Sequence, residues 1–151
     1  MYRSVAHLSS LLKSARSDVR LGALFKIREQ LDVKPLKAYF FLGKRLIEDS
    51  DNDCRWQAVI IVGEYLRTNP TEVWRVIKRY GHAEDQDLRS AVSTILLEHL
   101  LEYQFQKFFP EVEREEVHSL FFADTLSMCS RFGQPKRDWK KIETLLQENK
   151  R

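Results

Sequence analysis

The sequence predicts an all-α fold of about eight helices, paired as about four helical hairpins. One observation for this fold is a segment that recurs three times at nearly constant spacing, each copy with apolar residues four positions apart. A second is the scarcity of chain breakers, since five Gly and four Pro in 151 residues are few for a many-turned β protein. A third is that no segment has the alternating pattern of a strand.

The repeated segments are 18–31, 53–66 and 87–100, offset by 35 and then by 34 residues. Each opens with Asp, a hydrophobic residue and Arg, and each has Glu eleven positions and Leu thirteen positions after that Asp. The structural repeat positions are Asp18, Arg20, Asp53, Arg55, Asp87 and Arg89. Their repetition argues against catalysis, because an active site is needed once whereas a stacking contact is needed in every repeat.

Each repeated segment is predicted to be a helix with one apolar stripe facing the core. The stripe lies at offsets 1, 5, 9 and 13 from the Asp, which share one side of a helix. It contains Val19, Ala23, Ile27 and Leu31, then Cys54, Ala58, Val62 and Leu66, then Leu88, Val92, Leu96 and Leu100. Asp51 and Asp53, and likewise Asp85 and Asp87, are placed to cap helix N-termini and to meet the positive end of the helix dipole.

A second helix is expected before each repeated segment. These helices are predicted over 4–14, over 35–48 and from Pro70 to Gly81, the last opened by a capping box at Asn69 to Glu72. The third repeated helix is expected to continue to about residue 106. We predict one domain over 1–151, with repeats at about 4–31, 35–67 and 70–105 and C-terminal capping helices at 111–132 and 135–148.

The repeats resemble the HEAT-repeat family, including the short HEAT-like units of phycobilin lyases. The Asp-x-Arg at 18/20, 53/55 and 87/89, with the small residues and the Leu that follow, carry the resemblance over about residues 15–105. It implies a short right-handed α-solenoid of about four HEAT-like hairpins, in which the Asp and Arg stabilise stacking between neighbouring repeats. It also implies a scaffold that binds partners.

Nothing in the sequence indicates catalysis, so we expect no catalytic residues, no cofactor and no metal ion. Glu115 and His118 form a single E-x-x-H, whereas a carboxylate-bridged di-metal bundle needs two such pairs. Cys54 and Cys129 make neither a C-x-x-C nor a disulfide framework. No stretch reaches the roughly 18 apolar residues of a membrane span, and Met1 to Leu12 lack the apolar region of a signal peptide. A cytoplasmic protein without membrane contact is expected.

The candidate binding site is the face opposite the core stripe. Its predicted partner-contacting residues are Leu21, Phe25, Arg28, Trp56, Ile60 and Arg67, and the third segment places Ser90, Thr94, Leu97 and Leu101 there. Large apolar residues beside Arg are typical of protein interfaces. The alternative is that these side chains pack on the preceding helices or on the C-terminal pair. The function that we favour is a non-catalytic scaffold that binds an unidentified protein partner along this face.

The charge distribution bears on a second hypothesis, binding to nucleic acid. Residues 1–45 carry a net charge of +7, residues 46–130 carry −8 and residues 131–151 carry +4. The basic ends can touch a phosphate backbone, and the architecture resembles alkylated-DNA glycosylases built from HEAT-like repeats. Candidates for that role are Trp56, Trp74, Arg55, Arg67 and Arg75. The acidic middle counts against it, because phosphate binding needs many Lys and Arg in one track.

Overall fold

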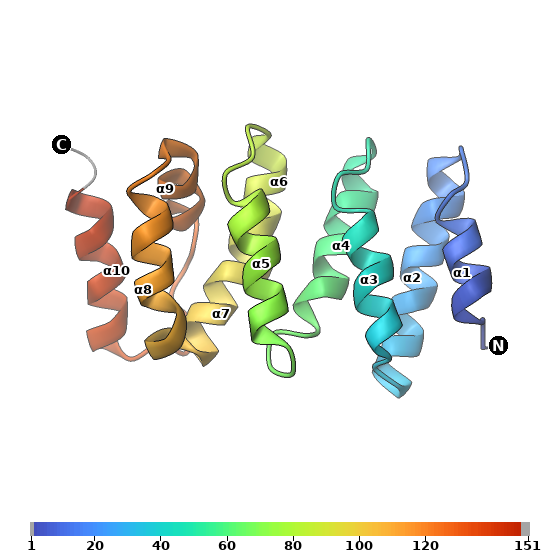
Figure 1. Cartoon of the computed structure of the whole chain (residues 1–151), viewed down its shortest axis with the longest axis horizontal. Coiled ribbons are helices and arrows are strands. Elements are labelled where there is room, and N and C mark those ends of the chain that lie inside the picture. Colours follow the sequence, from blue (N-terminus) through green and yellow to red (C-terminus); the bar gives the residue numbers. More distant parts are fainter. Residues whose placement is uncertain (1, 149–151) are drawn as a thin grey trace. The chain divides into compact units, whose positions relative to one another are not determined.

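Every regular element is a helix in the computed structural model of this chain, which describes residues 2–148 (Figure 1). No strand occurs among those residues, which confirms the predicted all-α class. The chain forms two compact units, the first ending at Tyr65 and the second beginning at Leu66. The single domain over 1–151 stays a prediction from the sequence.

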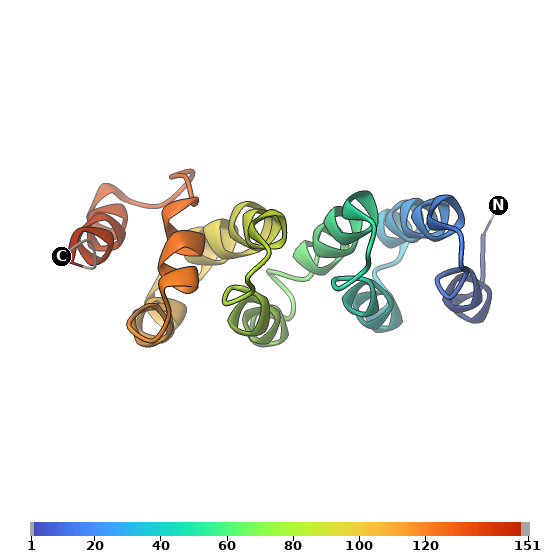
Figure 2. The same cartoon turned by 90° about the horizontal axis from the view of Figure 1, so that it is seen from above.

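The first unit is built from two helical hairpins. Its helices are α1 (Val5–Leu11), α2 (Ser17–Val33), α3 (Lys37–Arg45) and α4 (Asn52–Gly63). Within this unit α1 and α3 lie in one layer and α2 and α4 in a second (Figure 2). Helix α2 packs along α4, and α3 packs on α4. This arrangement places the first two repeated helices, α2 and α4, side by side.

A close approach of backbones fixes the packing of α3 on α4. Gly43 on α3 is buried, and a Cβ atom added there would lie 2.7 Å from Ile61 Cγ2 and 3.3 Å from the Ala58 carbonyl oxygen. Ala58 itself is fully buried. Small side chains at 43 and 58 therefore let the two helices approach more closely than larger residues would.

The predicted core stripe is confirmed in both units. Eleven of its twelve residues are buried, and Val19 is half-buried. The predicted caps are confirmed at Asp51, which accepts from the Cys54 N–H (3.0 Å), and at Asp85, which accepts from the Leu88 N–H (3.2 Å). The capping box at Asn69 is wrong, because that side chain makes no capping hydrogen bond; Pro70 supplies the first residue of the helix instead.

The second unit contains the remaining helices. They are α5 (Pro70–Tyr80), α6 (Gln86–Ala91), the π-helical segment η1 (Val92–Leu97), α7 (Glu98–Tyr103), α8 (Phe105–Glu116), α9 (Leu120–Ser127) and α10 (Lys136–Glu148). α6, η1 and α7 follow one another without a break, so the third repeated segment contains a π-bulge. α5 packs on η1, α8 packs on α7 and α9, and α10 packs on α9.

The C-terminal helices differ from the prediction. The helix expected to continue to residue 106 ends at Tyr103. The prediction of one helix over 111–132 is wrong, because two helices, α8 and α9, cover that part of the chain. α8 begins at Phe105 and runs through Pro110. The backbone hydrogen bond that a proline removes inside a helix is offset by the burial of four apolar residues of that helix. A new helix then starts after Ser119, whose Oγ accepts from the Phe121 and Phe122 N–H groups. The predicted helix at 135–148 is present as α10.

Candidate functional site

The three repeated arginines share one hydrogen bond. In each repeat, Nη1 donates to the backbone carbonyl six residues earlier, in the turn that leads into its own helix. The acceptors are the carbonyls of Ser14 (2.9 Å), Asp49 (3.1 Å) and Ala83 (2.7 Å) for Arg20, Arg55 and Arg89 respectively. A contact repeated at equal sequence separation holds each turn on its helix, which is a structural role.

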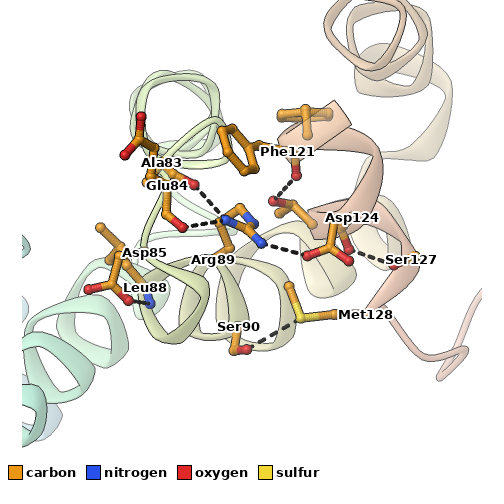
Figure 3. A network of polar contacts seen from close by, with 12 residues as sticks. Ala83, Glu84, Asp85, Leu88, Arg89, Ser90, Phe121, Asp124, Ser127 and Met128 are labelled. Carbon is orange, nitrogen blue, oxygen red and sulfur yellow. Dashed lines mark hydrogen bonds and ion pairs between the residues drawn. The ribbon is translucent and has the colours of Figure 1, made fainter. Parts of the chain in front are cut away.

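Two of these arginines also link consecutive hairpins. Arg20 donates through Nε and Nη2 to both carboxylate oxygens of Asp49 (2.8 and 3.0 Å), which precedes α4. Arg89 donates to Asp124 of α9 (2.7 Å), and the Phe121 ring lies 4.9 Å from its guanidinium carbon (Figure 3). The Asp that opens the motif in the first repeat, Asp18, makes no link of this kind. It is exposed and pairs with Arg16, the residue that precedes α2.

The contact with Arg20 affects the pKa of the Asp49 carboxyl. Burial by itself raises the pKa of the Asp49 carboxyl, but hydrogen bonds from Arg20 and the Asp51 N–H, with the charges of Arg20 and Arg55, hold that pKa below its ordinary value. Asp49 is therefore ionised at neutral pH and remains paired. The link between the two hairpins of the first unit is a charge-assisted one.

The predicted partner-contacting residues of the first unit lie on α2 and α4 and are at least partly open to solvent. Phe25 is 47% exposed, and Leu21, Arg28, Trp56 and Ile60 are half-buried. Arg28 Nη1 donates to Gln57 Oε1 (2.6 Å), which joins the two helices at this face. These five residues, Leu21, Phe25, Arg28, Trp56 and Ile60, form what we call the α2/α4 surface.

A hollow of about 280 Å³ borders the α2/α4 surface. Phe25 and Arg28 line it, together with three carboxylates. Asp32 was expected on this face from its position in the first repeat, whereas Glu29 and Glu64 were not selected from the sequence. Glu29 pairs with Lys26 (2.9 Å), and that bond lowers the pKa of the exposed Glu29 carboxyl. Glu29 and Glu64 both stand eleven positions after the repeat Asp, so this recurrence was the signal that could have identified the acidic rim.

The predicted face does not continue in the same form into the second unit. Leu97 and Leu101 are fully buried, because the helix that carries them packs on α5, α8 and α9. Arg67 is exposed and belongs to the second unit, where its guanidinium carbon lies 4.3 Å from the centre of the Tyr103 ring. The alternative expectation, packing on the C-terminal helices, describes these leucines.

Glu115 of the E-x-x-H pair contacts a histidine other than His118, and His99 lies among carboxylates. Glu115 lies 3.5 Å from His82, and His118 is exposed at the end of α8. His99 lies between Glu98 (3.6 Å) and Glu102 (3.1 Å), and buried Glu98 accepts from the Ser130 N–H (2.5 Å), which holds the loop after α9. Within residues 2–148 no group of three or more His, Cys, Asp and Glu is arranged to hold a metal ion.

Both cysteines are buried thiols in contact with hydrogen-bond acceptors. Burial raises the pKa of Cys54 to about 11 and the pKa of Cys129 to about 12. The thiolate is the nucleophilic form, so neither group is activated at neutral pH. None of the helices in the described part of the chain combines the length and the apolar content that crossing a membrane requires.

Comparison of the chain with protein families, with curated proteins and with solved structures finds no match.

Proposed function

We propose that this chain is a non-catalytic protein-binding module that captures its partner on the α2/α4 surface. The observation that carries the proposal is the exposed Phe25 ring on α2. It lies beside helix α4, which carries Trp56, and polar side chains form a rim next to Phe25. We also propose that the hairpins are HEAT-like repeats that stack into a short right-handed α-solenoid. The arginine contact repeated at Ser14, Asp49 and Ala83 supports that reading.

The composition of the α2/α4 surface supports a protein partner. Single exposed apolar residues are normal on any protein. Here four apolar side chains, two of them aromatic, share the outward side of two adjacent helices. Interfaces are typically apolar and aromatic at the centre and polar at the rim, and Arg28 with the three carboxylates of the hollow supplies such a rim.

Nucleic-acid binding has less support. Of its candidate residues, Trp74 is buried with its ring 6.0 Å from that of Phe108, and Arg55 is buried as well. Arg75 pairs with Glu72 (2.8 Å). The carboxylates beside Phe25 would repel a phosphate backbone.

Site-specific photo-cross-linking tests the proposed surface. A photoreactive phenylalanine analogue at position 25 should trap a partner in the native lysate. The matched control is position 41, since Phe41 on α3 is 45% exposed in the same unit but lies in the other helix layer. One discrete product from position 25 and none from position 41, identified by mass spectrometry, supports the proposal. Equal products from both positions would contradict it.

A further inference from the structure

A second hollow lies between α8 and α10 in the second unit. Its volume is about 650 Å³, within the range of built binding pockets. Its lining residues run from Phe105 to Glu113 on α8 and from Arg137 to Glu148 on α10, so it follows both helices as a groove. We call it the α8/α10 groove, and its defining residues are Phe105, Phe109 and Glu113 on α8 and Lys140, Lys141 and Leu145 on α10.

The floor of the α8/α10 groove is apolar and closely packed. The rings of Phe105 and Phe109 stack with centroids 4.7 Å apart and planes inclined by 15°. Both rings and the Leu145 side chain are largely buried, so little of their surface is open to solvent. Such a floor accepts aliphatic or aromatic anchors but offers no exposed ring on which a nucleic-acid base can stack.

The α10 wall of the groove carries three cations and, at its C-terminal end, the carboxylate of Glu148. Lys140 and Lys141 are exposed, and neither forms an ion pair with any described residue; Lys141 Nζ lies 6.0 Å from the centre of the Phe105 ring. Arg137, one helical turn earlier, lines the same wall and reaches only its neighbour Asp138 (3.4 Å). The three cations follow i, i+3, i+4 spacing, so they project along one side of α10.

We infer that the α8/α10 groove binds an acidic, amphipathic helical segment of a partner protein. Leu or Phe side chains of that segment would occupy the floor, and its carboxylates would face the cations of α10. A phosphate backbone fits less well, because it has no apolar group to occupy the floor formed by Phe105, Phe109 and Leu145. This site is separate from the α2/α4 surface, so either proposal can fail without the other.

The probes are three synthetic helical peptides titrated into the full chain and followed by fluorescence anisotropy. The first has Leu and Phe on one face and Glu on the other. The second replaces every Glu by Lys, and the third keeps Glu but replaces Leu and Phe by Ser. We expect the first to bind at least about tenfold more tightly than either of the others, since charge and apolar anchors both contribute. Equal affinity for the first and second peptides, or for the first and third, would overturn the inference.

Charge reversal locates the binding. The double variant Lys140→Glu, Lys141→Glu should lose at least about tenfold in affinity for the acidic peptide. The matched control Lys34→Glu, Lys37→Glu makes the same change at exposed lysines of the first unit and should alter affinity by less than about threefold. Equal losses in both double variants would overturn the inference. So would self-association that only the first double variant abolishes, because the occupant would then be a second copy of the chain.

Discussion

Substituting Gly43 by alanine tests the close approach of α3 and α4. The added Cβ would lie 2.7 Å from Ile61 Cγ2, so the Ile61 side chain or the helix must shift. Overpacking of this kind costs about 1–3 kcal/mol of unfolding free energy. Against that, replacing Gly by Ala inside a helix gains about 1 kcal/mol. The expected net change is a loss of about 0–2 kcal/mol.

Gly22→Ala is the matched control for this substitution. Gly22 lies in α2, is exposed, and has nothing within 4 Å of the position of an added Cβ. The helix gain is therefore uncompensated, and the variant should be more stable than the natural chain by about 1 kcal/mol. Urea denaturation followed by circular dichroism gives both values. If Gly43→Ala stabilises the chain as much as Gly22→Ala does, the packing of α3 on α4 has been misassigned.

Three further predictions follow from the polar contacts. Arg89→Ala removes hydrogen-bond donors to Ala83, Glu84 and Asp124 and should lower the unfolding free energy, measured by urea denaturation, by about 1–3 kcal/mol. Arg16→Ala breaks an exposed ion pair and should cause no measurable loss of unfolding free energy. Equal losses in the two variants would refute the stabilising role of the buried arginine. The lowered pKa of Asp49 means that ionised Asp49 stabilises the folded chain fully above the unfolded-state pKa of about 3.9, and that this stabilisation is lost as pH falls through the folded-state pKa. The difference in unfolding free energy between the natural chain and Asp49→Asn should therefore narrow on acidification. A difference that widens would contradict this. Raised thiol pKa values predict that Cys54 and Cys129 react with a disulfide reagent at pH 8 only after unfolding, and rapid labelling of the folded chain would be inconsistent with their burial.

Local patterns predicted most of the helices and their buried sides. Four-residue spacing identified the core stripe because residues four positions apart lie on one side of a helix, and that side faces the core in all three repeated helices. Asp51 and Asp85 were predicted as caps because a side-chain oxygen at that position meets free N–H groups whatever the tertiary structure. These features depend on a few adjacent residues, so the sequence carries them directly.

Features that depend on distant contacts were missed. The sequence predicts one helix that ends at about residue 106 and another that begins at 111, yet a single helix runs across Pro110. It is held there by the buried side chains of Phe105, Phe108, Phe109 and Val112. The sequence predicts a helix through residue 132, whereas the chain leaves the helix after Ser127. The loop that follows is held by the hydrogen bond from the Ser130 N–H to buried Glu98, which joins residues 32 positions apart and so leaves no local pattern. The same applies to the candidate site: offsets alone placed Leu97 and Phe25 on equivalent faces, and only the packing of α8 and α9 distinguishes them.

The affinity of the cross-linked partner for two single variants tests the central claim most directly. Isothermal titration should compare the natural chain with Phe25→Ala and with Phe41→Ala, which remove the same side chain at nearly equal exposure. Truncating a central aromatic costs about 2 kcal/mol or more, so Phe25→Ala should weaken binding about thirtyfold. Phe41→Ala should leave the dissociation constant within about threefold of the natural value. Equal affinities for the two variants would contradict a binding role for the α2/α4 surface.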